Sequence, residues 1–167
     1  GQTRLRLAWG SACEAAAQWA VLDALPGATL REAGLCMVGG AALGALGEPA
    51  EGLPPLGASP DGVLQHGEGG DLEVLEVKCH CPFRWKKGRW HVADPGPYSS
   101  IPPLHVPQLQ LEMLAVGARS ALLASHSATR GTRLFRVPFD EGYVKAMLGV
   151  LRRFQGSFVE GRAVPGA

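Results

Sequence analysis

The stretch that most constrains the fold is LEVLEVKCHCP, from Leu72 to Pro82, because it places acids and a lysine inside an apolar run. In a strand, residues two apart project to the same face, so Glu76 and Lys78 share a face while Val77 points into the core. Burying an acid beside a lysine is costly unless the two are paired or bind something. The stretch is therefore a strand with an ordinary ion pair, a metal site, or a strand that carries chemistry.

Length and composition indicate one globular domain. A chain of 167 residues can bury roughly 70% of its unfolded surface and needs no disulfide to fold. Hydrophobic residues make up 46% and charged residues 19%, and the net charge of +1 indicates no particular partner. We expect a single domain over 1–167, and the start on Gly1 is also compatible with a piece of a longer chain.

No membrane span is expected. The longest uncharged stretch, 33–47, is rich in glycine and shorter than the roughly 20 apolar residues that cross a bilayer. We expect a soluble intracellular protein, with nucleus, organelle and bacterial or viral cytoplasm left open. The cysteines at 13, 36, 79 and 81 do not form an evenly spread framework, so reduced thiols are expected.

The first half of the chain predicts a helix followed by strands. Apolar residues recur at helical spacing over 9–25, with Ser11 as a possible cap and Pro26-Gly27 as a stop. The segment 28–38 has the rhythm of a strand pair, and 39–55 is expected to be a loop. Strands are expected in 55–65 and 71–79, joined by the turn-rich HGEGGD. The expected apolar face of the helix consists of Ala12, Ala15, Ala16, Trp19, Leu22 and Leu25.

The second half predicts a hairpin, a helix, another hairpin and a last helix. FRWKKGRWHV suggests a hairpin or finger, and 119–128 with 132–139 suggests a second one. A helix is expected over 104–116, with Leu104 and Leu111 on its apolar face and Pro107 tolerated in its first turn. An amphipathic helix is expected over 140–154. The order favours one α/β or α+β domain.

Asp61, in SPDG, can lie beside Glu76 if the two strands are neighbours. Converging carboxylates repel, and a hard divalent cation such as Mg²⁺ or Mn²⁺ removes the repulsion by binding an oxygen of each. The carbonyl of Val77 is a possible third ligand, and Lys78 can orient an attacking water at a phosphate. The alternative is a surface aspartate in a turn and a half-exposed Glu-Lys ion pair.

A zinc site at Cys79, His80 and Cys81 is a weaker alternative. Structural zinc needs four ligands, and Cys13 and Cys36 lie in unrelated elements without a second close pair. His66, His91 and His105 would supply ligands only by accident of folding. The strand end is therefore expected to carry buried or idle thiols.

The segment after Pro82 combines cations with aromatic rings. Lysine and arginine neutralise phosphates, and tryptophan can stack on an unpaired base, so the segment favours contact with DNA. The alternative is a solvated hairpin whose tryptophans pack underneath it. The candidate DNA-binding residues here are Arg84, Trp85, Lys86, Lys87, Arg89 and Trp90.

Several blocks together resemble the lambda-exonuclease or YqaJ-like viral recombinase branch of the PD-(D/E)XK nuclease superfamily. They are WGSACEAAA, GASPDGVL, a glycine-rich spacer, LEVKC and PQLQLEM, in the family's order, and the resemblance extends from Trp9 to about Phe154. It implies a restriction-endonuclease-like core, with a central mixed sheet flanked by helices.

The resemblance assigns roles by position. Asp61, Glu76 and Lys78 match the catalytic acid, acid and lysine. Glu14 matches a helix glutamate near the metals, and Gln108 matches a helix glutamine that faces the active site, with Gln110 beside it. Ordinary polar helix surface remains the alternative for these last three.

The sequence departs from the family in two places. KCHCP has two extra residues before the proline. His105 stands where a tyrosine is common, and an imidazole is still able to contact phosphate or metal.

The resemblance implies a Mg²⁺-dependent DNA exonuclease, 5′ to 3′ as in the family, that serves recombination, repair or DNA degradation. Metal-assisted phosphodiester hydrolysis follows from the residues, whereas DNA over RNA and exonuclease over endonuclease follow only from the resemblance. The alternatives are a structure-specific endonuclease and an inactive DNA-binding module. Oligomeric state stays open, a homo-oligomer included.

Overall fold

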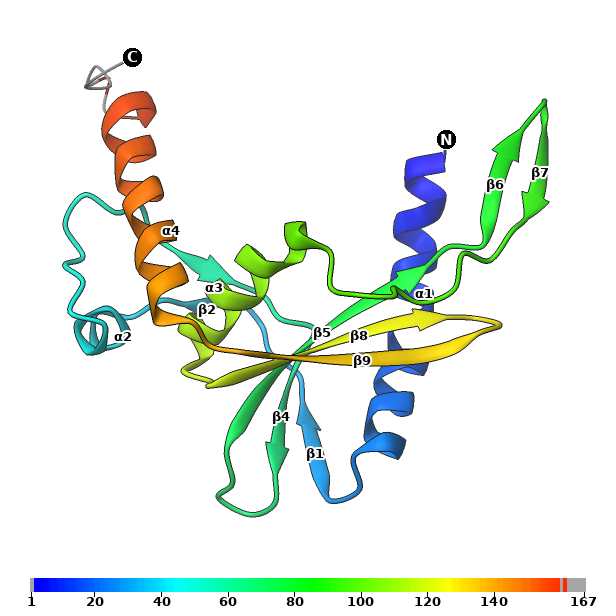
Figure 1. The fold of residues 1–167 in the computed structure, drawn as a ribbon, viewed down its shortest axis with the longest axis horizontal. Helices are drawn as coiled ribbons and strands as arrows, with labels where there is room; N and C mark the ends of the chain where they lie inside the picture. Colours follow the sequence, from blue (N-terminus) through cyan, green and yellow to red (C-terminus); the bar gives the residue numbers. More distant parts are fainter. Residues whose placement is uncertain (1, 160, 162–167) are drawn as a thin grey trace.

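A central five-stranded sheet organises the protein (Figure 1), of which the computed structural model describes residues 2–159 and 161. The strand order is β1-β4-β5-β8-β9. Only the β5–β8 pair is parallel among these neighbours, so the sheet is mixed, as predicted. The strands are β1 (Ala28–Arg31), β4 (Gly62–His66), β5 (Leu72–His80), β8 (Ser120–Ser127) and β9 (Gly131–Pro138).

Helix α1 (Gln2–Ala24) covers one face of the sheet. Ala17 and Val21 are fully buried against the sheet, together with Leu75 and Val77. The helix begins well before Trp9, so Ser11 is not its cap. The expected apolar face is right only in part, because Leu22 and Leu25 pack against the core whereas Trp19 is 73% exposed. Alanines occur on more than one face of this helix, so their spacing alone does not reveal which of them pack against the sheet.

Helix α3 (Val106–Val116) covers the opposite face, after a 3₁₀ turn at Pro103–His105. Leu109 and Met113 pack there against Val74, Ala121 and Leu123. Pro107 lies in the first turn, as predicted. Leu104 was expected on the apolar face but is 73% exposed, because the α-helix begins only after it.

A third cluster of buried hydrophobic residues joins α3 to the next helix along the chain. Helix α4 (Glu141–Phe154) is capped by Asp140, whose side chain accepts a hydrogen bond from the Tyr143 backbone N–H at 2.9 Å. A π-helical turn follows at Gln155–Val159. A short helix, α2 (Gly40–Ala45), occupies the segment predicted as a loop, because Leu43 and Leu46 pack against α4.

The segment 28–38 does form two strands, but they do not pair with each other. β1 pairs with β4, whereas β2 (Cys36–Met37) pairs with β3 (Gly57–Ala58) in a separate ribbon. The predicted pairing was wrong because each strand finds its partner farther along the chain. Alternation along a short segment identifies a strand but not its neighbour.

The predicted hairpin after Pro82 is confirmed. It consists of β6 (Phe83–Lys86) and β7 (Arg89–Val92), and it projects from the body of the protein (Figure 1). Lys87 and Gly88 have φ values of 51° and 75°, as a tight two-residue hairpin turn requires. At the base, the Phe83 ring packs edge-on against Trp9 at 5.3 Å between centroids.

Candidate active site

The edge of β4 brings Asp61 next to Glu76. Gly62 pairs with Leu75, so the residue before Gly62 lies beside the residue after Leu75. The Asp61 carboxylate accepts a hydrogen bond from the Val77 backbone N–H at 2.7 Å. The SPDG turn is thereby attached to the middle of β5.

Burial raises the pKa of Asp61 to about 6, and the negative charges of Glu76 and Glu14 add to the effect. The hydrogen bond from Val77 and the charge of Lys78 act in the opposite direction without cancelling it. The charge of Lys78 therefore does not offset the burial of Asp61 and its negatively charged neighbours.

Glu76 is 3% exposed, although it is a charged residue. One of its oxygens, Oε1, accepts a hydrogen bond from the ammonium of Lys78. The other, Oε2, is buried and has no hydrogen-bond partner among the residues that the structure describes. A buried carboxylate oxygen without a donor is costly. The atom is therefore open to a ligand.

Glu14 and Gln18 extend the site along α1. The Gln18 amide donates to the Asp61 backbone carbonyl at 3.1 Å and approaches the Glu14 carboxylate at 3.5 Å. Glu14, Gln18 and Asp61 line a polar hollow of about 450 Å³. Gln18 was not predicted from the sequence, although it lies four residues after Glu14 and therefore on the same face of the helix.

On the α3 side, Gln108 faces a buried acid. Its amide donates to Oε1 of Glu112 at 2.8 Å, and Glu112 is 1% exposed. Burial, followed by the charge of Glu76, raises the pKa of Glu112 to about 8. Glu112 was not singled out from the sequence, although it lies four residues after Gln108 and is the one charged residue of α3.

Gln110 is not part of this site, which corrects the prediction. It is 2% exposed, its amide donates to the Pro138 carbonyl at 2.9 Å, and its Oε1 accepts from the Asp140 backbone N–H at 2.9 Å. Residues two apart on a helix point about 200° apart. The side chain of Gln110 thus joins α3 to the start of α4.

His105 borders the site from beneath the surface. It is 8% exposed, and its Nε2 lies 3.2 Å from the Tyr98 hydroxyl. Burial lowers the pKa of His105, and the charge of Lys78 lowers it further. The predicted direct contact with DNA does not fit this burial. Tyr98, which was not predicted from the sequence, is the hydrogen-bonding partner of His105.

The side chains after Lys78 contact the protein itself. His80 lies 2.7 Å from the Ser125 hydroxyl, and burial, followed by the charge of Cys13, raises the pKa of Cys79 to about 11. Within residues 2–159 and 161, no three His, Cys, Asp or Glu side chains form a preassembled metal site. A cation at Asp61 and Glu76 would therefore need further oxygens, for which the Val77 carbonyl remains the predicted source.

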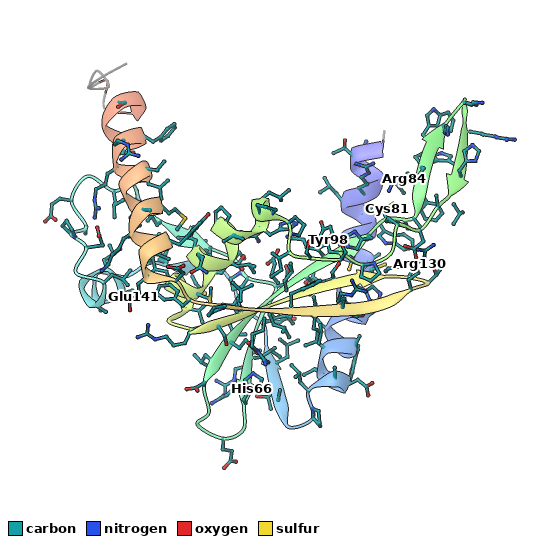
Figure 2. The ribbon with its side chains drawn as sticks, viewed as in Figure 1. His66, Cys81, Arg84, Tyr98, Arg130 and Glu141 are labelled. Atoms are coloured by element: carbon teal, nitrogen blue, oxygen red, sulfur yellow. The ribbon has the colours of Figure 1, made fainter. Side chains whose placement is uncertain are left out.

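The hairpin presents its two tryptophans to solvent. Trp85 and Trp90 lie opposite each other, with ring centroids 5.2 Å apart, and are 48% and 47% exposed. The alternative with tryptophans packed underneath is therefore wrong. Figure 2 shows Arg84, Cys81 and Tyr98 near the hairpin base, where they help line a hollow of about 300 Å³.

A mixed sheet covered by α1 and α3, with an acid, a second acid and a lysine at two adjoining strands, defines a nuclease-like α/β architecture. The chain belongs to the YqaJ-like viral recombinase domain family, whose model matches residues 2–119. This confirms the predicted resemblance. No curated protein matches the chain.

Two solved structures share the fold. One is LHK-Exo in complex with dAMP, with a TM-score of 0.64 and 18% identity over 94% of this chain and 69% of that one. The other is the same alkaline exonuclease, from Laribacter hongkongensis, with a TM-score of 0.61 and 17% identity over 93% of this chain and 69% of that one. None of the helices in the described part of the chain is long and apolar enough to cross a membrane.

Proposed function

We propose that the protein is a divalent-metal-dependent deoxyribonuclease that digests DNA from its ends, and that residues 1–167 form one nuclease domain. The observation that carries the proposal is the buried Oε2 of Glu76, which has no hydrogen-bond partner in the described part of the chain and lies in a residue beside Asp61 and Lys78. Family membership and a fold shared with an alkaline exonuclease support the choice of substrate and reaction.

The donor set fits a hard cation. Carboxylate and carbonyl oxygens suit Mg²⁺ or Mn²⁺, and Asp61, Glu76 and the Val77 carbonyl would hold the ion, with Glu14 nearby. When bound, the ion makes water a better nucleophile and stabilises negative charge on the phosphate.

The protein's own groups have separate roles. Lys78, held by Glu76 at the rim of the site, orients the attacking water and offsets charge on the phosphate. Gln108 donates its amide hydrogen bond to Glu112, and Gln18 holds the Asp61 turn against α1. His105, which lies close enough to Lys78 to be affected by its charge, positions Tyr98 through their hydrogen bond.

The hairpin is proposed to hold DNA. Its exposed cations neutralise phosphates, and the Trp85–Trp90 pair offers an aromatic surface for an unpaired base. Digestion in the 5′ to 3′ direction is proposed from the family alone. A structure-specific endonuclease on the same core, or a DNA-binding module without activity, are the alternatives.

A test of the chemistry compares wild type with Lys78→Ala on an end-labelled linear duplex, with Mg²⁺ or with chelator. We expect wild type to cut only with Mg²⁺, and Lys78→Ala to lose roughly 10²- to 10⁴-fold in rate while binding DNA as before. The control is Lys145→Ala, an exposed lysine on α4. Cutting by Lys78→Ala at the parental rate would show that Lys78 is structural.

A further inference from the structure

Glu112 lies where neither the family pattern nor the sequence assigned a role. It extends from α3 toward β5 and is 1% exposed, as buried as the apolar residues around it. Its carboxyl group lies within hydrogen-bonding reach of that of Glu76, and the charge of Asp61 also acts on it. Three carboxylates from three different elements therefore influence one another in one buried place.

Each of the two buried glutamates has one oxygen satisfied. Oε1 of Glu112 accepts from the Gln108 amide at 2.8 Å, and Oε1 of Glu76 accepts from Lys78. Oε2 of both residues is buried without a hydrogen-bond partner in the described part of the chain. The hydrogen bonds to the Oε1 atoms hold both carboxylates in place, so the fold itself determines the positions of the two Oε2 atoms.

Two acceptor oxygens that face the same buried place can be satisfied in two ways. A proton held between them serves one pair of oxygens, whereas a divalent cation serves both residues and Asp61 together. The cation also offsets the negative charge of all three groups, which a single proton does not.

We propose that Glu112 is a further ligand of the divalent cation, so that β5, α3 and the turn before β4 each supply a carboxylate. These three carboxylates are not preassembled around one point in the described residues, so the bound ion would draw them together. This inference rests on the proposed function and adds a ligand to it. In this arrangement Gln108 is a positioning residue, because its amide holds the Glu112 carboxylate toward Glu76.

The test measures binding of Mn²⁺ alone by calorimetry, together with the thermal midpoint with Mn²⁺ and with chelator, for wild type and Glu112→Gln. Glutamine keeps the size and can still donate to Glu76, but it is a poorer cation ligand. We expect Mn²⁺ affinity to fall about tenfold or more, while the midpoint in chelator stays the same or rises because a buried acid is gone.

A matched control is Glu141→Gln, an exposed acid at the start of α4 (Figure 2), whose Mn²⁺ affinity should equal that of wild type. Unchanged or tighter Mn²⁺ binding by Glu112→Gln would overturn the inference and leave the pair bridged by a proton. If wild type itself binds no Mn²⁺, the proposed function fails as well, so the two failures are distinguishable.

Discussion

Glu76 and Lys78 show how far single residues can be interpreted from a sequence. The cost of placing charges in an apolar strand indicated a site, and in the structure Glu76 is 3% exposed and paired with Lys78. Glu112 was missed, because a glutamate on a helix is usually solvated and its burial depends on β5, which lies across the core. Gln110 was predicted to be a polar site residue, but its side chain is buried and forms hydrogen bonds with the end of β9 and with the residue before α4.

The raised pKa of Asp61 predicts a dependence of stability on pH. A carboxyl group whose pKa is about 6 in the folded chain and near 3.9 when unfolded stabilises the fold below the lower value. That contribution is lost as pH rises through about 6. In chelator, Asp61→Asn should therefore match wild type at acidic pH and be more stable by about 1 kcal/mol at alkaline pH, because the group is partly solvated.

Urea unfolding at both pH values measures this difference. Added Mg²⁺ should reverse the order at alkaline pH, because asparagine lacks the charge that holds the cation. An Asp61→Asn variant that is less stable than wild type in chelator at alkaline pH would contradict the account.

At the scale of elements, strands and hairpins were easier to predict than helix faces. Turn residues and alternation located β4, β5 and both hairpins, and Lys87 and Gly88 form the turn of the first of these with positive φ angles. The face of α1 was not predictable from alanine spacing, and β1 and β2 have partners that no local pattern specifies. The short helix α2 depends on packing against α4.

The β6–β7 hairpin should set affinity for DNA and leave the chemistry unchanged. Replacing Lys86, Lys87 and Arg89 with alanine removes up to three exposed cations, so the slope of log affinity against log salt should fall by roughly 2 to 3 units. Fluorescence anisotropy with a labelled duplex across a salt series measures the slope. The Lys145→Ala variant is the control, and an unchanged slope in the triple variant would place the hairpin away from DNA.

For the whole molecule, the order of elements indicated one α/β or α+β domain, and the family resemblance implied a mixed sheet flanked by helices. The structure has this arrangement, with α1 and α3 on opposite faces of the sheet. Residues distant in sequence form the candidate site because that sheet places the turn before β4, the middle of β5 and two helices together. The family relation extends over residues 2–119, which contain all of these groups.

Digestion of DNA from an end is tested most directly with two forms of one plasmid. Linearised and covalently closed circular duplex are incubated with the protein and Mg²⁺, and the released products are separated by size. We expect linear DNA to be degraded steadily to mononucleotides while the closed circle stays intact, with no products in chelator. Cleavage of the closed circle would contradict digestion from ends, and intact DNA of both forms would contradict the nuclease itself.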